Sequence, residues 1–442
     1  MVEKELIRIF EAGYRAVQPA ALLPAHLSLE SGQLRIGNKL YNRSALRRLV
    51  LLSLGKAASA MALEAQRILG DAITDALVVT KYGHALPGLH WPQLETGHPV
   101  PDSAGEKAAA RIGELLNDLK ENDLVLVLIS GGASALVADL APGISLADWQ
   151  WLSKALLHSG AAIGEINTVR KHFSTLKGGQ LARLVQPASL HALLLSDVPG
   201  DDPAVIASGP TVPDPGYFKD AAAVLEKYHL LPDLPPAIKA RLEAGLHGDI
   251  ADTPKPGDPL FQNVLNELIG TNLVALAAAA AAAQALGYEA HVDPHPLEGD
   301  AEQQALEWLQ RAKAMKWTGR GCLLAGGETT VTVKGSGKGG RNQHLALAAL
   351  DHILKNPSFG YPALLCGGTD GTDGPTDAAG ACITPELIKK LAAEKVDPRP
   401  WLAENDAFGF FSRYGGLLHT GPTQTNVMDL LLVIPPAGST ED

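Results

Sequence analysis

The stretch VTVKGSGKGGRNQHLAL combines glycines at phosphate-binding spacings with an arginine at the start of a helical pattern. Gly335, Gly337 and Gly340 match the G-x-G-x-x-G turn that binds the pyrophosphate of a dinucleotide. Gly335 and Gly340 also have Walker A spacing, but Arg341 and Asn342 replace the required lysine and serine or threonine. A Walker A loop is therefore excluded, because the β- and γ-phosphates and Mg²⁺ would lack their usual partners.

The residues before this turn weaken the dinucleotide alternative. The stretch ETTVTVK alternates threonine and valine, which predicts a half-exposed antiparallel strand. The first strand of a dinucleotide-binding domain is instead buried on both faces. A simpler use of the glycines is a flexible turn that lets Arg341 enter a site at the start of the helix. Its planar guanidinium can bind two oxygens of one phosphate or carboxylate.

Polar residues also follow several predicted buried strands, at the end where α/β sheets bind ligands. Lys56 follows LVLLSLG, Asp197 follows ALLLS, and the turn SGGAS follows LVLVLI. Glycines in such a turn let backbone N–H groups point at one anion, which a nearby ammonium can also approach. Ordinary turns and solvated surface residues are the alternative. The remaining members of this set are Lys81, His84, Ser130, Gly131, Gly132 and Ser134.

Two further stretches carry charge. The stretch GGTDGTDGPTDAAGA places Asp370, Asp373 and Asp377 after a buried strand, without the spacing of an EF-hand loop. These carboxylates could hold Mg²⁺ or orient a substrate hydroxyl, although aspartate and glycine are also standard turn formers. The stretch INTVRKHFSTLKGG predicts a solvated basic face, some of whose charges could reach an anionic substrate. Its basic residues are Arg170, Lys171, His172 and Lys177.

The elements that position these residues form two predicted domains. Up to about residue 210, continuous apolar runs such as LVLLSL and LVLVLI alternate with helical patterns. This alternation predicts a doubly wound α/β domain with a parallel sheet covered on both faces. A proline-rich connection begins at about residue 210. We expect an N-terminal domain over residues 1–265 and a smaller α/β domain over residues 266–442.

Length, composition and net charge limit the classes of protein to which the chain can belong. With 442 residues, 46% of them hydrophobic and 19% charged, the chain can bury large cores. The net charge of −11 argues against a general nucleic-acid binder. Three cysteines without a C-x-x-C pair predict buried free thiols in a reducing compartment. No signal peptide or bilayer-spanning run is evident, so we expect a cytoplasmic protein.

The chain resembles the bacterial and archaeal glycerate 2-kinase family, which is also catalogued as hydroxypyruvate reductase of tartrate degradation. The motifs that carry the resemblance are GKAASAM, TGHPVPD, LISGGASAL, INTVRKHFSTLKGG, LLLSDVPGDDPAVIASGPTVPD, GGETTVTVKGSGKGGRNQHLAL and GTDGTDGPTDAAGA. The resemblance implies a Rossmann-like N-terminal domain, a smaller C-terminal domain and an active site in the cleft between them. It also implies phosphorylation of D-glycerate to 2-phosphoglycerate by ATP with a divalent metal such as Mg²⁺.

Matched position by position, the family's catalytic lysine falls on Lys56 and its active-site arginine on Arg341. Ala133 stands where the family usually has a third glycine, and His344 where it usually has a glutamate. The remaining expected site residues fall into three groups. They are Ser130, Gly131, Gly132, Ser134, Gly337, Gly339 and Gly340 for the nucleotide, Asp197, Glu328 and Lys177 for the substrate, and Asp370 and Asp373 for the metal.

Three functions stay open from the residues. Two basic anchors, a glycine turn and acidic loops favour a kinase. An NAD(P)H-dependent hydroxypyruvate reductase is the second alternative, and a non-catalytic sensor of small acids is a distant third. We expect a small-molecule substrate and neither nucleic acid nor membrane as a partner. A homodimer is an open alternative for the oligomeric state.

Overall fold

The computed structural model describes residues 1–436 and divides the chain into two compact units. Residues Leu22–Ile269 form one unit, which we call the parallel-sheet unit. Residues Met1–Ala21 join Gly270 and the residues after it in the other, the mixed-sheet unit. The division after Ile269 lies close to the expected boundary at residue 265. The first 21 residues, however, group with the C-terminal half, whereas the sequence prediction assigned them to the N-terminal domain.

The parallel-sheet unit is built on strands in the order β6-β5-β4-β7-β8-β9. From β6 to β8 every neighbouring pair is parallel. The direction in which successive strands are added reverses between β4 and β7, and ligands bind beyond the strand ends at such a switch point. The strands are β4 (Leu49–Leu54), β5 (Asp75–Lys81), β6 (Gln93–Thr96), β7 (Leu124–Ile129), β8 (Ser189–Leu195) and β9 (Val264–Gly270).

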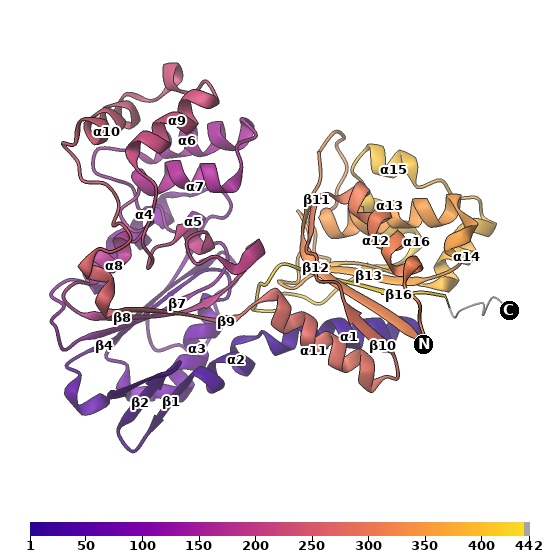
Figure 1. Ribbon diagram of the computed structural model, residues 1–442, viewed down its shortest axis with the longest axis horizontal. Helices are drawn as coiled ribbons and strands as arrows, with labels where there is room; N and C mark the ends of the chain where they lie inside the picture. The colour runs from indigo at the N-terminus through magenta and orange to yellow at the C-terminus, as the bar shows by residue number, and fades with distance from the viewer. Residues whose placement is uncertain (437–442) are drawn as a thin grey trace. The chain divides into compact units, whose positions relative to one another are not determined.

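Helices cover this sheet on both faces, as the continuous apolar runs predict. Helices α4, α5 and α8 share a buried core with Val50, Leu52 and Leu54 of β4. Ser53 faces the opposite side, where its hydroxyl donates to the carbonyl of Ala58 in α3. Helices α6, α7, α9 and α10 form a separate apolar cluster (Figure 1).

Nine helices lie wholly or partly in this unit as the structure describes it. They are α2 (Pro19–His26), α3 (Ala58–Leu69), α4 (Ser103–Leu115), α5 (Ala133–Leu136), α6 (Leu146–His158), α7 (Ile163–His172), α8 (Gln180–Val185), α9 (Phe218–Lys227) and α10 (Pro236–His247). A small antiparallel sheet precedes the large one. Its strands are β1 (Leu27–Glu30), β2 (Gln33–Ile36) and β3 (Lys39–Asn42).

The mixed-sheet unit has strands in the order β10-β12-β16-β13-β14-β15, and β11 also pairs with β12. Its strands are β10 (Glu289–Val292), β11 (Leu297–Asp300), β12 (Gly321–Thr330), β13 (Ala363–Gly368), β14 (Gly380–Ile383), β15 (Leu417–Leu418) and β16 (Asp429–Ile434). Its helices are α1 (Val2–Ala16), α11 (Asn272–Ala285), α12 (Ala301–Ala314), α13 (Arg341–Lys355), α14 (Pro385–Ala393), α15 (Arg399–Ala403) and α16 (Ala407–Tyr414).

The antiparallel pairing that the sequence predicts for ETTVTVK, residues 328–334, is wrong. Strand β12 runs antiparallel to β16 up to Gly327, but Glu328–Thr330 pair in parallel with β11. The strand ends at Thr330, and the following residues leave the sheet. Most of β12 is buried because α11 packs on one face of the strand and α12 and α13 pack on the other (Figure 1).

Helix α1 joins the mixed-sheet unit because its apolar face packs on α11 and the sheet. Leu6, Phe10 and Tyr14 are buried on that face, as their helical spacing predicts. At Gly13 a Cβ would lie 2.7 Å from Leu430 and 3.1 Å from the carbonyl oxygen of Ala275, so glycine permits this close approach. Figure 1 shows α1 and α11 together on one face of the sheet, with α12, α13 and α16 on the other.

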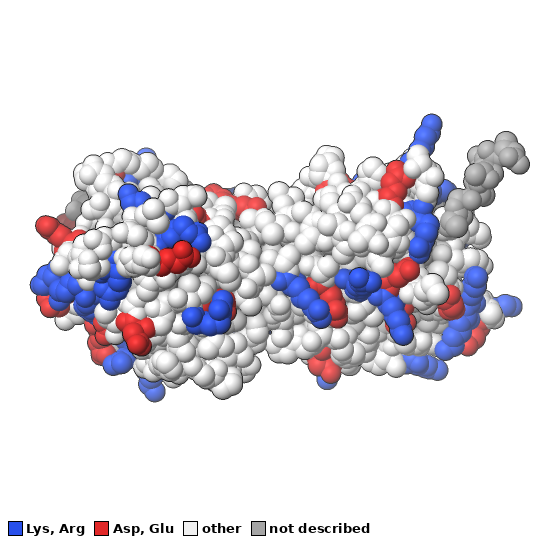
Figure 2. Space-filling view, turned by 90° about the horizontal axis from the view of Figure 1, so that it is seen from below, with Lys and Arg blue, Asp and Glu red and all other residues white. Residues whose placement is uncertain are grey.

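Three further features of the described residues concern the surface charge, the cysteines and the length of the helices. On the face drawn in Figure 2, basic and acidic side chains are interspersed and do not gather into a patch of one sign. Cys322, Cys366 and Cys382 are buried free thiols. None of the helices within residues 1–436 is long and apolar enough to cross a bilayer.

Candidate functional site

The loops that follow β4 and β7 are joined by hydrogen bonds at the switch point of the parallel sheet. The backbone N–H of Lys56 donates to the carbonyl of Gly131 over 2.9 Å. The N–H of Ala57 donates to the Ser130 hydroxyl over 3.0 Å. The structure therefore brings together Lys56 and the SGGAS turn, which the sequence predicted to share one rim.

Two glycines make this approach possible. Gly55 has a φ of +124°, and a Cβ there would overlap the Ser130 hydroxyl and carbonyl. Gly132 has a φ of +85°, and a Cβ there would lie 3.2 Å from the His98 ring and 3.3 Å from Cγ of Lys56. The side chains of His98 and Lys56 thus stand directly beside the backbone of the turn.

The SGGAS turn presents backbone donors beside this lysine. Across the described chain, no acceptor lies in hydrogen-bond range of the N–H groups of Gly131, Gly132, Ala133 and Ser134. Consecutive N–H groups of this kind form an anion-binding concavity. His84 also reaches the loop, with its Nδ1 3.1 Å from the carbonyl oxygen of Lys56.

A chain of polar side chains leads away from the turn. The hydroxyls of Ser134 and Ser208 lie 2.9 Å apart, and Ser208 donates to Oδ1 of Asn167 over 2.9 Å. Ser208 has a φ of +62° and the preceding Ala207 a φ of +51°, conformations that cost energy in residues other than glycine. Neither Ser208 nor Asn167 was expected from the sequence, since ASGP resembles any other turn.

The two predicted substrate residues of this unit have different surroundings. Asp197 is partly buried and follows the end of β8, at the same edge of the sheet as Lys56. The Lys177 ammonium is buried and pairs with the carboxylate of Asp139, which also accepts a hydrogen bond from Ser174. Its Nζ also donates to the carbonyl of Val137 over 3.3 Å, so Lys177 joins its own segment to residues 137–139, and a direct contact with substrate would require this pair to open.

In the mixed-sheet unit, Arg341 is held by two carboxylates. Its Nε and Nη2 donate to the two oxygens of Asp429 over 2.6 and 3.0 Å, and its Nη1 donates to Glu328 over 2.6 Å. Burial opposes the charged form, but the attraction of Asp429 and Glu328 outweighs it and raises the pKa of the guanidinium. About a third of the Arg341 side chain stays exposed, which leaves part of a permanent cation accessible.

The acidic loop meets the start of the same helix. Asp373 is buried and accepts hydrogen bonds from the backbone N–H groups of Asn342 and Gln343 over 3.0 and 2.8 Å. Burial raises the pKa of its carboxyl to about 7, against the effect of these two donors. Asp370 is partly buried, and its Oδ1 accepts hydrogen bonds from the N–H and hydroxyl of Thr372. Among residues 1–436, no three histidine, cysteine or acidic side chains gather closely enough to hold a metal by themselves.

The glycine-rich loop before α13 is packed against the turn that joins α15 and α16. A Cβ at Gly335 or Gly337 would overlap the backbone of Glu404 or the side chain of Asp406. The loop N–H groups are also engaged, since Gly337 donates to the carbonyl of Glu404 over 2.8 Å and Lys338 to Asp406 over 3.0 Å. The G-x-G-x-x-G spacing is therefore explained by close packing within the chain.

Two other loop glycines differ in their surroundings. At Gly340 a Cβ would overlap the carboxylate of Asp373, so this glycine lets the acidic loop cap α13. At Gly339 the nearest atom would lie 3.4 Å away, an ordinary contact. The role expected for these glycines with a nucleotide stays a prediction.

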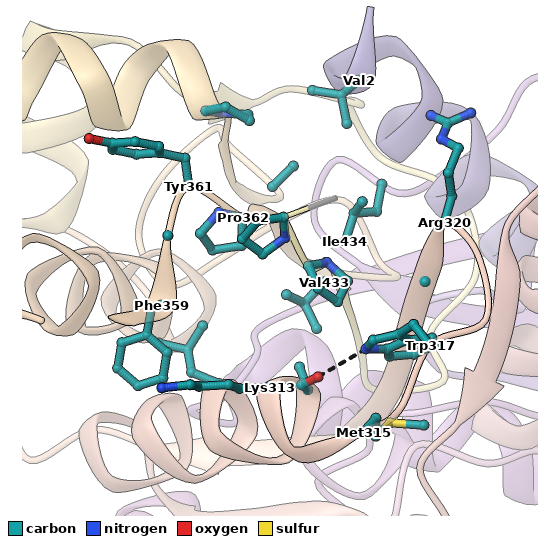
Figure 3. Close-up of a pocket in the computed structure, with 18 of the residues that line it drawn as sticks. Val2, Lys313, Met315, Trp317, Arg320, Phe359, Tyr361, Pro362, Val433 and Ile434 are labelled. Atoms are coloured by element: carbon teal, nitrogen blue, oxygen red, sulfur yellow. Dashed lines mark hydrogen bonds between the residues drawn. The ribbon is translucent and has the colours of Figure 1, made fainter. Parts of the chain in front are cut away.

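A cavity of about 770 Å³ lies elsewhere in the mixed-sheet unit (Figure 3). Trp317, Phe359, Tyr361 and several prolines line it, and the Trp317 indole N–H donates to the carbonyl of Ala312 over 3.1 Å. None of the expected site residues is among those that line it.

Comparison with known proteins identifies the family. Residues 5–243 match a domain of unknown function, DUF4147, and residues 321–429 match the MOFRL family. A glycerate 2-kinase of Pyrococcus horikoshii is 41% identical over 87% of this chain and 86% of its own. A D-glycerate 2-kinase of Thermotoga maritima is 43% identical over 88% of this chain and 90% of its own. The chain belongs to the glycerate kinase family.

A solved member of the glycerate kinase family has the same fold. The crystal structure of a glycerate kinase from Thermotoga maritima superposes with a TM-score of 0.82 at 38% identity. The match covers 98% of this chain and 99% of that one. The mixed α/β architecture described above is thus shared within the glycerate kinase family.

The two departures from the usual glycerate kinase sequence have local explanations. Ala133 begins α5 with an ordinary negative φ, so the structure does not require glycine there. The ring of His344 is buried, and its Nε2 lies 3.2 Å from Glu302 of α12. A carboxylate therefore still lies beside the position where glycerate kinases usually have a glutamate.

Proposed function

We propose that the chain is a glycerate 2-kinase, which transfers the γ-phosphoryl group of ATP to the 2-hydroxyl of D-glycerate. The observation that carries this proposal is the contact between Lys56 and the SGGAS turn at the switch point of the parallel sheet. Phosphoryl transfer needs positioning and charge neutralisation more than covalent chemistry. A cation beside a set of backbone donors supplies both.

The turn supports binding of a phosphate group. Its unengaged N–H groups, from Gly131 to Ser134, are neutral donors that can stabilise anionic oxygens. A Cβ at residue 132 would press against the side chains of Lys56 and His98, so glycine at this position leaves room for an anion beside the backbone. The strand order of this unit, with the expected site at its switch point, also supports a Rossmann-like arrangement.

We assign charge neutralisation at the transferring group to Lys56 and Arg341, one from each unit. Arg341 is suited to this role because Asp429 holds one edge of its guanidinium while part of the group stays exposed. The proposal requires both units to contact the substrates during the reaction, and this agrees with the interdomain active site implied by the family resemblance. Water would be excluded when both contacts form.

The acidic loop fits a divalent metal only in part. Both carboxylate oxygens of Asp373 accept hydrogen bonds from the start of α13, which makes Asp373 a helix cap and a poor ligand. Asp370 is partly exposed and is the better candidate. Mg²⁺ commonly uses one or two carboxylates together with substrate phosphates and water, and it would neutralise phosphate charge when bound.

One pair of assays tests the function. Purified protein is mixed with D-glycerate, ATP and Mg²⁺, and the product is identified by phosphorus NMR as 2- or 3-phosphoglycerate. A parallel reaction contains hydroxypyruvate and NADH, with Lys56→Ala as the matched variant in both. We expect 2-phosphoglycerate from the unaltered chain and very little from the variant. Oxidation of NADH without any ADP formation would instead establish the reductase alternative.

A further inference from the structure

Arg170, near the end of α7, is a partly buried cation, and the described residues supply no hydrogen-bond or ion-pair partner for its side chain. Its Nε is shielded from solvent and has no hydrogen-bond acceptor. Within the described chain, no carboxylate forms an ion pair with its guanidinium, and burial lowers the pKa of this group with no neighbouring charge to oppose the shift. Burying an unpaired charge destabilises a fold, so such a group is typical of a site that an anion completes.

The other basic residues of this stretch are all engaged. Lys171 pairs with Asp214 over 3.3 Å, and Lys177 pairs with Asp139. The nearby Arg241 donates from Nε to the carbonyl of His172 over 2.8 Å. Hydrogen-bond acceptors are therefore available in this region, and Arg170 differs from its basic neighbours in having none.

Arg170 is also linked to the SGGAS turn by position. Asn167 precedes it by three residues, so the two side chains lie on neighbouring positions of the same helix face. Asn167 accepts from Ser208, whose hydroxyl contacts Ser134 of the turn. Helices α7 and α5, the second of which begins within the SGGAS turn, both pack against η4 (Ile206–Ser208), whose backbone is held in strained conformations. All of these residues belong to one unit.

We propose that Arg170 binds the carboxylate of the acceptor substrate, and this assignment rests on the proposed kinase function. Lys56 and the N–H groups of the turn already provide a place for phosphate. An acceptor that carries a carboxylate and hydroxyls needs a second, separate anion partner, and a guanidinium matches two carboxylate oxygens with two parallel hydrogen bonds. Asn167 and Ser134, which are linked through the Ser208 hydroxyl, supply polar groups that can contact the hydroxyls of the acceptor.

The proposal predicts selectivity for acids over uncharged polyols. Glycerol resembles glycerate in size but lacks the carboxylate, so its binding would shield the Arg170 guanidinium further from water without pairing it. A binding site whose polar group pairs with a group of the substrate rejects analogues that lack this substrate group. Arg170 would thus determine specificity as well as affinity.

The experiment compares Arg170→Met and Arg170→Lys with Arg111→Met, a control at an exposed arginine of α4. We expect Arg170→Met to raise the KM for D-glycerate roughly 10²-fold, as for loss of a charge-assisted pair, while the KM for ATP changes little. Arg170→Lys should recover part of the loss, and the preference for glycerate over glycerol should fall in Arg170→Met. Arg111→Met should leave these values unchanged.

Thermal melting separates this proposal from the function on which it rests. Without ligand, Arg170→Met should melt at the same temperature as the unaltered chain or higher, because it removes a partly buried charge that has no ion-pair partner within the described chain. Added D-glycerate should raise the melting temperature of the unaltered chain but not that of Arg170→Met, whether or not the protein transfers phosphate. A rise in the KM for ATP alone would make Arg170 a phosphate ligand and overturn the proposal. A lower melting temperature with both KM values unchanged would make it structural and would also overturn the proposal.

Discussion

The contact between Asp429 and Arg341 can be tested by changing each carboxylate that holds the arginine. Asp429→Asn keeps the shape of the side chain but replaces one of its two oxygens with an NH₂ group. That group cannot accept the hydrogen bond that the guanidinium now donates there. Glu328→Gln makes the same chemical change at the other partner. The two substitutions differ in burial, because the Asp429 side chain is 2% exposed and the Glu328 side chain 40% exposed.

Burial sets the expected magnitudes. A hydrogen bond to a charged group contributes about 1.5–3 kcal/mol, and breaking a buried ion pair costs about 3–5 kcal/mol. Arg341 is partly exposed and would keep Glu328, so the lower end applies to Asp429→Asn, about 2 kcal/mol in the free energy of unfolding. Glu328→Gln should cost less than about 1 kcal/mol, as for pairs at the surface.

Calorimetric and chemical unfolding would measure both variants, with the kinase assay beside them. We expect Asp429→Asn to lower kcat about 10-fold or more, because the guanidinium loses the contact that fixes its orientation. Glu328→Gln should reduce kcat less unless Glu328 also contacts the substrate, as the sequence predicts, in which case the KM for D-glycerate should change as well. Equal losses of stability in the two variants would refute the reasoning from burial.

Three further predictions concern other residues. Gly132→Ala should abolish most activity, because its Cβ would press on Lys56 and His98, whereas Gly143→Ala, at the same φ of +85° with no neighbour within 4 Å, should lose only stability. Burial lowers the pKa of His191, whose Nε2 lies 2.9 Å from Glu267 and Nδ1 3.1 Å from Tyr41, so folding stability should fall as the pH drops below the ordinary histidine value of about 6.5. His191→Gln should flatten that part of the stability profile in acid-unfolding measurements. Removal of Lys56 or Arg341 should each cost roughly 10²–10⁴ in kcat, and the double variant should lose much less than the product if both act on one phosphoryl group; losses that multiply would show that they act independently.

The parallel sheet could be predicted because its signal is local. The runs LVLLSL and LVLVLI are continuous and apolar, and the strands they predict, β4 and β7, are fully buried. Ligands bind beyond the ends of such strands, so Lys56 and the SGGAS turn, which follow β4 and β7, could be predicted to lie in one site. Each of these predictions depends only on a strand and the residues that follow it directly in the sequence.

The partners that hold the site could not be predicted in this way. Asp429 lies 88 residues after Arg341 and appears in the sequence only as one acidic residue before the closing strand. Asp139 pairs with Lys177 across 38 residues, so a lysine expected to meet substrate lies in a buried ion pair, and its contact with substrate stays a prediction. The packing of α1 on α11 joins residues separated by most of the chain. Such pairings are set by tertiary structure, which a local pattern does not contain.

The glycine-rich loop shows why a motif alone does not name a ligand. Glycines at G-x-G-x-x-G spacing indicate that another group comes close to the backbone, and in dinucleotide-binding domains that group is a pyrophosphate. Here the approaching groups around Gly335 and Gly337 are Glu404 and Asp406, which also accept the N–H groups that a phosphate would use. The SGGAS turn is the opposite case, because its donors have no acceptor within the described chain. The free donors, more than the glycine spacing, therefore indicate where an anion binds.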